Sequence, residues 1–271
     1  MKRIRLDSEL VRRGLARSRE HAAHLIQDGR VTVGGRAASK PATQVDPAAA
    51  IVVAEAEEGP DYVSRGAHKL VGALEAFGPL GLTVRGRRCL DAGASTGGFT
   101  DVLLRNGAAH VLAVDVGYGQ LAWSLRNDER VTVMERVNVR DLTPELVGEP
   151  PDLVVGDLSF ISLRLVLPPL YACAAAVADF VLLVKPQFEV GKGRVGQGGV
   201  VRDPGLRVQA VLDVAEAAQT LGLSVRGVTA SPLPGPAGNV EYLIWLGKGP
   251  GADPVPDVKA AVERAVAEGP R

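Results

Sequence analysis

The feature that most limits the fold is an alternation of short apolar stretches with helical stretches, which begins near residue 63. Apolar strands are expected at residues 89–92, 111–116, 131–134, 153–156, 180–184, 224–229 and 240–246. Helices are expected between them, at residues 66–77, 97–106, 119–127, 162–178 and 205–221. Continuous apolar strands joined by helices are typical of a parallel sheet covered on both faces. The sequence therefore predicts an α/β domain whose ligands bind at the carboxyl ends of its strands.

The first 54 residues follow a different pattern. Two helices are expected at residues 6–15 and 18–29, the first with Asp7 as its N-cap and Gly14 near its end. A hairpin that turns at Gly34 and Gly35 and a strand at residues 51–53 follow. The acidic residues 55–60 have the composition of a linker. We therefore expect a small α+β domain over residues 1–59, a linker at 60–64, the α/β domain over 65–247, and a tail at 248–271 with a short helix at 258–267.

Basic side chains are concentrated in the first domain. The whole chain of 271 residues has a formal net charge of zero, which by itself indicates no polyanionic partner. Residues 1–40, however, carry ten Lys and Arg against four Asp and Glu. A local excess of this kind indicates a phosphate-binding surface, although charge runs also occur on solvated helices.

Other functional classes are disfavoured by the composition. Cys89 and Cys173 both lie in apolar stretches, which predicts buried free thiols in a reducing compartment and neither a disulfide nor a metal site. The apolar residues 165–184 include Pro168, Pro169 and Asp179, so they are not expected to span a membrane. The N-terminus lacks the apolar core of a signal peptide. We therefore expect a cytoplasmic protein without membrane association.

A glycine-rich loop, DAGASTGGFT at residues 91–100, follows the first strand of the α/β pattern. Glycine lets the backbone approach a ligand closely, and the helix that follows offers free amides. A dinucleotide loop would have the spacing GxGxxG, whereas this loop has GxxxGG preceded by Asp91. An acid at that position would repel a pyrophosphate but would suit the ammonium of an amino-acid cofactor. A glycine turn used for packing alone is the remaining alternative.

Two further strand ends favour the same cofactor. Asp115 closes the next strand, where a carboxylate can accept hydrogen bonds from ribose hydroxyls, and Asn138 follows the third strand, where an amide can bind an adenine edge. Together they favour S-adenosylmethionine over NAD. The residues expected to bind it are Asp91, Gly93, Ser95, Thr96, Gly97, Gly98, Phe99, Asp115, Val116, Asn138 and Asp157.

Four charged residues stand at informative places. Lys69 lies in the helix before the first strand, and Glu241 lies in the last strand. Asp157 and Lys185 directly follow the fourth and fifth strands. A charge at a strand end is either part of a site or costly to bury. A lysine whose pKa is lowered by a second lysine or by desolvation can take the proton of an oxygen that accepts a methyl group. Surface salt bridges are the alternative, above all for Lys69 and Glu241.

The second domain resembles the FtsJ-like ribose 2′-O-methyltransferases, whose Lys-Asp-Lys-Glu tetrad maps onto Lys69, Asp157, Lys185 and Glu241. Over roughly residues 2–246 the chain resembles the TlyA (haemolysin A) family of bacterial rRNA 2′-O-methyltransferases. The segments that carry this resemblance, apart from the loop at 91–100, are YVSRGAHKL (62–70), DVGYGQL (115–121), DLSFIS (157–162), KPQFEVG (185–191) and GNVEY (238–242). The resemblance implies a Rossmann-like class I methyltransferase fold with seven strands, the last of them antiparallel. It also implies cytidine riboses of 23S rRNA as substrates and, in the longer members that this chain resembles, of 16S rRNA as well.

The first domain resembles the S4 RNA-binding domain. This resemblance implies that basic side chains dock rRNA mainly through its shape and phosphates. The side chains expected to do so are Arg3, Arg5, Arg17, Arg19, Lys40 and Arg65. Lys192 and Arg194, in the loop at residues 191–199, are expected either to close over the RNA or to face solvent. A target nucleotide in a duplex or hairpin is expected to be flipped out.

Three other functions stay open at this point. A haemolysin-like membrane-active protein would not need four charges at strand ends. A pseudouridine synthase with an S4 domain would need a catalytic Asp in another fold and no cofactor loop. An RNA-binding protein with an inactive cofactor site differs from an enzyme only by experiment. We expect no obligate protein partner, and the sequence leaves open whether Lys185 removes the proton or only orients the oxygen.

Overall fold

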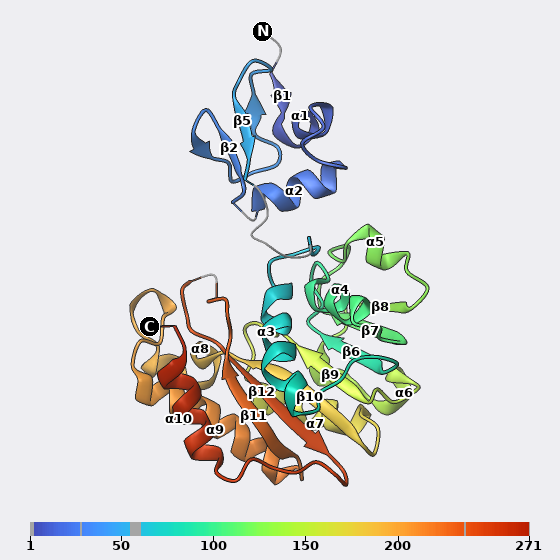
Figure 1. Ribbon diagram of the computed structural model, residues 1–271, viewed down its shortest axis with the longest axis vertical. Helices are drawn as coiled ribbons and strands as arrows, with labels where there is room; N and C mark the ends of the chain where they lie inside the picture. Colours follow the sequence, from blue (N-terminus) through green and yellow to red (C-terminus); the bar gives the residue numbers. More distant parts are fainter. Residues whose placement is uncertain (1–2, 28, 55–60, 236, 271) are drawn as a thin grey trace. The chain divides into compact units, whose positions relative to one another are not determined.

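The computed structural model describes residues 3–27, 29–54, 61–235 and 237–270 (Figure 1). The chain divides into two compact units, Met1–Arg65 and Gly66–Arg271. The acidic segment 55–59 and the first residue of the linker expected at 60–64 lie outside the described residues.

The first unit packs two helices against small antiparallel sheets. Its elements are β1 (Ile4–Arg5), α1 (Leu6–Arg12), α2 (Arg19–Gln27), β2 (Val31–Val33), β3 (Arg36–Ala37), β4 (Gln44–Val45) and β5 (Ile51–Val53). Strand β2 pairs with β3 and β5, and β1 pairs with β4. Leu6, Leu10 and Ile26 are fully buried or nearly so, and they form its core with Val31.

The local signals of this unit are mostly confirmed. Gly34 and Gly35 turn the β2–β3 hairpin with φ of 56° and 76°, values that glycine adopts without strain. Helix α1 ends at Arg12, shortly before Gly14 with its φ of 72°. The expectation that Asp7 is the N-cap is wrong. Helix α1 already begins at Leu6, and the Asp7 carboxylate lies in its first turn, where it accepts a hydrogen bond from the backbone N–H of Ser8.

The second unit is built on a seven-stranded sheet. Its strands are β6 (Arg88–Ala92), β7 (His110–Asp115), β8 (Val131–Glu135), β9 (Leu153–Gly156), β10 (Ala178–Val184), β11 (Ser224–Ala230) and β12 (Tyr242–Lys248). They lie in the order β11-β12-β10-β9-β6-β7-β8, in which β12 runs antiparallel to both of its neighbours. The pairs from β10 to β8 are parallel. This arrangement confirms the predicted fold class.

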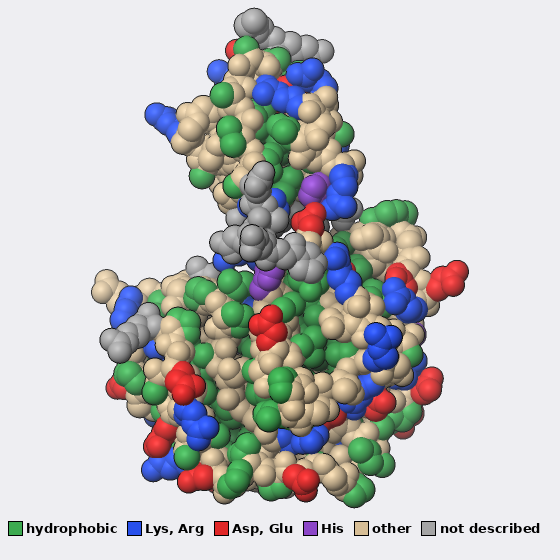
Figure 2. All heavy atoms as spheres, viewed as in Figure 1, with side chains coloured by type: hydrophobic (Ala, Val, Ile, Leu, Met, Phe, Trp, Pro, Cys, Tyr) green, Lys and Arg blue, Asp and Glu red, His purple; other side chains and the backbone are tan. Residues whose placement is uncertain are grey.

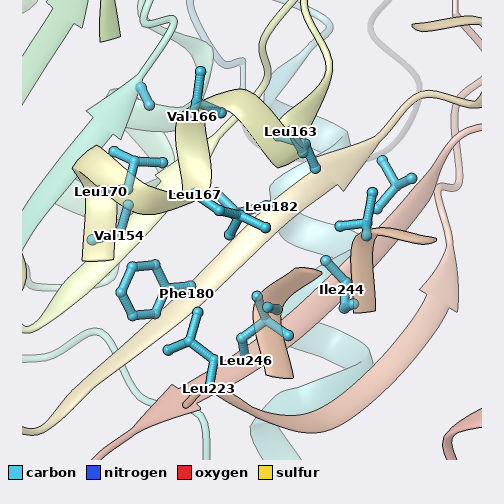
Figure 3. Packing of buried hydrophobic residues seen from close by; sticks show 14 of the residues in the cluster. Val154, Leu163, Val166, Leu167, Leu170, Phe180, Leu182, Leu223, Ile244 and Leu246 are labelled. Atoms are coloured by element: carbon cyan, nitrogen blue, oxygen red, sulfur yellow. The ribbon is translucent and has the colours of Figure 1, made fainter. Parts of the chain in front are cut away.

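Helices cover both faces of this sheet (Figures 1 and 3). They are α3 (Ala67–Phe77), α4 (Gly98–Arg105), α5 (Trp123–Arg126), α6 (Pro144–Val147), α7 (Leu163–Cys173), α8 (Pro186–Glu189), α9 (Pro204–Thr220) and α10 (Val258–Glu268), with short 3₁₀ turns η1 (Gly78–Leu80), η2 (Val139–Asp141), η3 (Lys192–Arg194) and η4 (Gln197–Gly199). On one face, α7 and α9 pack onto β9, β10 and β12 through an apolar cluster that includes Leu167, Phe180 and Ile244 (Figure 3). On the other face, α3 packs against α4.

Two expected helices are shorter than their sequence pattern. Helix α7 contains Pro168 and Pro169 and ends at Cys173, because the next residue, Ala174, has an extended backbone with a ψ of 151°. Helix α5 is a single turn that starts at Trp123. The expected start at Gly119 is wrong, because this glycine has a φ of 68° and the residues from Gly119 to Ala122 form a loop.

Two expectations from composition can be compared with the structure. Cys89 and Cys173 are buried free thiols, as predicted. In the described part of the chain, no helix has the length and apolar character needed to cross a membrane.

Candidate active site and cofactor cavity

Four charged side chains meet at one edge of the sheet. Nζ of Lys69 lies 2.7 Å from Oε2 of Glu241 and 3.3 Å from Oδ2 of Asp157. Nζ of Lys185 lies 2.6 Å from Oδ1 of the same Asp157. The exposed fraction of the four side chains ranges from 0% for Glu241 to 22% for Asp157. These are therefore not surface salt bridges, and the four residues form one chain in the order Glu241, Lys69, Asp157, Lys185.

The strand directions explain how residues so far apart in sequence meet. Asp157 follows β9 and Lys185 follows β10, so both stand at the carboxyl ends of adjacent parallel strands. Glu241 precedes β12, which is antiparallel to β10, and the start of β12 therefore lies at the same edge. Lys69 enters from the first turn of α3. Because β12 is antiparallel, Glu241, which precedes it, reaches the same edge as Asp157 and Lys185, which follow their strands.

The electrostatics distinguish the two lysines. Burial disfavours the charged form of Lys69, but the carboxylates of Asp157 and Glu241 outweigh this effect and raise its pKa. Burial also opposes ionisation of Asp157, but Lys185 and Lys69 outweigh it and lower the Asp157 pKa. Lys69 is therefore a fixed ammonium between two carboxylates. Lys185 contacts one carboxylate and donates a hydrogen bond to Oγ of Ser159 at 2.9 Å.

A cavity of about 690 Å³ adjoins this cluster. Six of the residues expected to bind a cofactor line it: Gly93, Ser95, Asp115, Val116, Asn138 and Asp157. Val137, Leu158, Ile161 and Leu165 give it an apolar wall. A lining that combines polar groups with apolar side chains suits a ligand that carries both a charged group and a flat ring.

Asp91 is buried behind this cavity, with 1% of its surface exposed. Its Oδ2 accepts a hydrogen bond from Oγ1 of Thr100 at 2.7 Å, whereas its Oδ1 has no hydrogen-bond partner among the described residues. Burial raises the Asp91 pKa to about 7. A buried acceptor without a donor is costly, and the ammonium of an amino-acid cofactor would supply one. The residue present at this position therefore fits S-adenosylmethionine.

The glycine of the loop is required by close packing. Gly93 has a φ of 84°, and a Cβ at this position would lie 2.8 Å from the carbonyl oxygen of Asp157. Any larger residue would push the cofactor loop away from the strand end that carries Asp157. The loop is also fixed from the other side, because the N–H of Ser95 donates to Oδ2 of Asp115 at 2.8 Å.

The third strand end, after β8, carries Asn138. Asn138 is exposed at the cavity, and its Oδ1 accepts a hydrogen bond from the N–H of Arg140 at 3.1 Å. This bond orients the side chain and leaves its amide nitrogen available to a ring nitrogen of a ligand.

Besides the buried Asp91, four expected cofactor residues do not line the cavity. They are Thr96, Gly97, Gly98 and Phe99, at the turn into α4 and in its first turn. Gly97 has a φ of 100°, and a Cβ there would lie 2.2 Å from Cδ1 of Leu125. Phe99 is 4% exposed. These residues hold the loop in shape, and direct contact with a cofactor stays a prediction for them.

The sequence reasoning missed several residues of the site. Ser159, Phe160, Phe188 and Gln120 all line the cavity. Phe160 is 91% exposed, has a φ of 63° and packs its ring 5.4 Å from that of Phe188. A bulky residue with positive φ and an exposed ring is strained and open to solvent, which is typical of functional loops. The segments that hold Phe160 and Phe188 were part of the family resemblance, but no role was derived for these side chains.

Buried Glu189 ties the loops behind Asp157 and Lys185 together. It accepts hydrogen bonds from Oγ of Ser162 at 2.5 Å and from the N–H of Leu163 at 2.7 Å. Burial raises its pKa despite these bonds. Because Glu189 ends the short helix that follows Lys185, its bonds fix the start of α7 against that helix.

The expected RNA-binding residues lie in the first unit, on whose visible face Figure 2 shows several Lys and Arg side chains. Arg3, Lys40 and Arg65 are exposed. Arg5 and Arg19 both contact Asp7, and Arg17 contacts Asp61. Much of the positive charge is therefore locally paired, which the charge count of the sequence did not indicate.

Comparisons with known proteins agree with this geometry. Residues 62–248 match the model of the FtsJ-like methyltransferases, and residues 4–51 match that of the S4 domain. The 16S/23S rRNA (cytidine-2′-O)-methyltransferase TlyA of Mycobacterium tuberculosis is 63% identical over 271 residues, which cover 99% of each chain. The chain belongs to the TlyA family.

Other TlyA-family relatives are more distant. The 23S rRNA (cytidine-2′-O)-methyltransferase TlyA of Campylobacter jejuni is 39% identical over 185 residues, which cover 68% of this chain and 70% of that one. A solved structure from Streptococcus thermophilus that bears the name hemolysin has a TM-score of 0.76 and 39% identity, over 99% of this chain and 96% of that one. The family, the two types of domain and the methyltransferase fold that the sequence predicted are thus confirmed.

Proposed function

We propose that this TlyA-family enzyme transfers a methyl group from S-adenosylmethionine to the ribose 2′-oxygen of a cytidine in 23S rRNA, and also in 16S rRNA. The observation that carries the proposal is the chain of Glu241, Lys69, Asp157 and Lys185 beside a cavity of suitable size and polarity. The name of the M. tuberculosis relative, which is similar over its full length, supports both rRNA substrates.

The cofactor, when bound, supplies an electrophilic methyl group. Asp91 would accept the ammonium of its amino-acid part, Asp115 its ribose hydroxyls and Asn138 its adenine edge. Leu158, Ile161 and Leu165 would cover the flat ring and keep water from it. Each of these assignments uses an acceptor, a donor or an apolar surface that faces the cavity or lies directly behind it.

The acceptor oxygen needs to be oriented and to lose its proton. As the 2′-oxygen forms its bond to the methyl carbon, the bond from that carbon to sulfur breaks and the hydroxyl proton leaves. Lys185 is the group that we assign to hold this oxygen and to receive its proton when its own amine is neutral. Lys69 stays charged between two carboxylates, and it fixes the Asp157 carboxylate toward Lys185.

The first unit would dock the substrate. Arg3, Arg5, Arg17, Arg19, Lys40 and Arg65 are the side chains that we assign to rRNA phosphates. Folded RNA offers phosphates and 2′-hydroxyls more readily than base edges, so a basic S4 domain suits it. Because ribosomal subunits are the partner, we place the enzyme in the cytoplasm.

The decisive experiment measures transfer and its position together. Ribosomal subunits from cells that lack the enzyme are incubated with the purified protein and tritiated S-adenosylmethionine, and 2′-O-methyl groups are then mapped on both rRNAs. We expect incorporation at cytidine riboses in 23S and 16S rRNA. Label on a base, or no label in either rRNA, would overturn the proposal. Label in 23S rRNA alone would restrict it to one substrate.

A further inference from the structure

A buried carboxylate joins two exposed arginines in the first unit. The Asp7 side chain is 5% exposed, whereas those of Arg5 and Arg19 are 45% and 60% exposed. Arg5 donates from Nε to Oδ1 of Asp7 at 3.1 Å and from Nη2 to Oδ2 at 2.7 Å. Nη2 of Arg19 donates to the same Oδ2 at 3.1 Å. Two guanidinium groups, one from the end of β1 and one from the start of α2, thus converge on one oxygen.

This geometry limits where the two positive charges can be. Because both Nη2 atoms bind one oxygen, they can lie no farther apart than the sum of their two distances to it, so a single phosphate can reach both groups. In the described part of the chain, the bonds to Asp7 occupy a minority of the five N–H donors that each guanidinium carries. The other donors can form the paired bonds that arginine makes with phosphate.

Asp7 is itself held rigidly. It accepts hydrogen bonds from both the N–H and the Oγ of Ser8, at 2.7 and 3.2 Å. Its bond to Arg5 outweighs the effect of burial and keeps the Asp7 pKa far below its usual range. The carboxylate is therefore a charged anchor whose position is set by the first turn of α1.

Two other acidic residues of this unit, Glu9 and Asp61, form ion pairs whose exposure differs from that of the Asp7 cluster. Glu9 also binds two arginines, but Arg13 is 22% exposed and donates a further bond to the carbonyl oxygen of Pro47. The positive charge of Arg13 is thus directed toward the interior of the unit. Arg17 pairs with Asp61, which is itself 46% exposed and imposes less order. The Asp7 cluster combines a buried anchor with two exposed cationic groups.

We propose that Asp7 is a positioning residue that holds Arg5 and Arg19 together as one phosphate-binding site on the first unit. The inference rests on the RNA docking proposed above and adds how that site is organised. Removing an acid from a surface that binds a polyanion normally tightens binding, because it removes repulsion. If Asp7 orders the two arginines in advance, its removal has the opposite effect, because binding must then fix two flexible side chains.

The sign of this effect is measurable with a charge-matched control. Affinity for purified 23S rRNA is measured for the full-length protein, for D7A and D7N, and for D46N. Asp46 is an exposed acid of the same unit whose Oδ1 caps the N–H of Ala48, a role that Asn retains. We expect D46N to bind as tightly as wild type or slightly more tightly. D7A is expected to bind about five-fold to tenfold more weakly, and D7N to lie between them because it keeps one acceptor oxygen.

A thermodynamic cycle separates positioning from loss of fold. If Asp7 acts through Arg19, D7A weakens binding less in an R19A background than in the wild type. Circular dichroism and thermal unfolding identify variants that fail to fold, and D7N, which keeps the size of the side chain, replaces D7A in the cycle in that case. D7A and D7N binding that equals or exceeds that of D46N would overturn the inference. Failure of the wild type to bind rRNA would instead overturn the docking proposal.

Discussion

Lys69 and Lys185 bind opposite oxygens of one carboxylate, that of Asp157. The first lysine is also held by Glu241, whereas the second has a serine hydroxyl as its other partner. Two residues of the same type therefore have different tasks. Lys69 is held between two carboxylates, and Lys185 is the lysine that we propose acts on the substrate.

This difference gives the first prediction. K185A should lower kcat by about 10²-fold to 10⁴-fold, the range for loss of a group that transfers a proton. Binding of S-adenosylhomocysteine should change little, because Lys185 is not among the residues that line the cavity. Binding of rRNA should also change little, because we assign its phosphate contacts to the first unit. The measurements are single-turnover methyl transfer and calorimetry. K259A, which alters an exposed lysine of α10, is the control, and transfer by K185A at the wild-type rate would exclude the assignment.

Asp91 gives a prediction about pH. Burial raises its pKa from 3.8 to about 7 in the folded protein, so the folded state holds a proton that the unfolded state releases. The free energy of unfolding of the cofactor-free protein should therefore fall as the pH rises from about 4 to about 7. D91N should remove this dependence while it weakens cofactor binding. Urea unfolding at several pH values measures the effect, and identical pH profiles for D91N and wild type would contradict it.

The same residue links cofactor binding to proton release. An ammonium favours the ionised carboxylate, so binding of S-adenosylhomocysteine at pH 6 should release a proton from Asp91. Affinity should rise with pH up to about 7 and then level off. Calorimetry in buffers of different ionisation enthalpy counts the released protons. A binding enthalpy that does not depend on the buffer would show that Asp91 is already ionised in the free protein.

Asn239 connects the end of the loop at residues 191–199 to the segment that carries Glu241. Its side chain is buried, with Oδ1 accepting from the N–H of Val201 at 2.9 Å and Nδ2 donating to the carbonyl of Gly199 at 2.8 Å. N239A leaves both backbone groups unpaired and should cost about 2 kcal/mol of stability. Because this change loosens the loop at residues 191–199, it should also raise KM for rRNA. Thermal unfolding and steady-state kinetics test this, and Q209A, on the exposed side of α9, is the control.

A second ionic cluster lies at the opposite edge of the sheet. Asp179 accepts hydrogen bonds from Arg87 at 2.6 Å, from Arg226 at 3.0 Å and from Nε1 of Trp245 at 2.8 Å. D179A leaves these donors without their acceptor and should lower the free energy of unfolding by about 2–3 kcal/mol. The rate of methyl transfer by the folded fraction should not change. An altered kcat at full folding would mean that this edge communicates with the active site.

The salt dependence of RNA binding tests the docking residues. Replacing both Arg5 and Arg19 with glutamine should weaken rRNA binding and reduce the steepness with which affinity falls as salt rises. The change follows from the loss of phosphate contacts, each of which releases counterions. R264Q, on α10 of the second unit, should leave the slope as in the wild type. Equal slopes for all three proteins would mean that these arginines do not contact phosphate.

Two members of the tetrad were predictable from the residues, because their position depends on chain direction alone. Asp157 and Lys185 follow apolar strands, and the carboxyl ends of parallel strands meet at one edge. The placement of Glu241 required the resemblance, because an acid before a strand joins that edge only if the strand is antiparallel. The exposed ring of Phe160 was not predictable, since its positive φ results from a loop that tertiary contacts of Phe188 and Glu189 hold in place.

Other features that the sequence did not predict also have local causes. Strands β1 and β4 have two residues each, too few for alternation to appear in the sequence. The pairing of Arg19 with Asp7 joins residues 12 apart across two helices, so a count of charges could not reveal that this acid orders the arginines. Side-chain pairings between segments are the part of the molecule that periodicity does not encode.

The place of β12 in the sheet has a consequence for biosynthesis. This strand is the last of the sheet to leave the ribosome, yet it lies inside the sheet between β10 and β11. Glu241, which directly precedes it, is therefore the last member of the tetrad to arrive. A nascent chain that has made everything up to β11 has Lys69 without one of its two carboxylates. Products of interrupted synthesis that stop before β12 therefore lack the complete tetrad that we propose for methyl transfer.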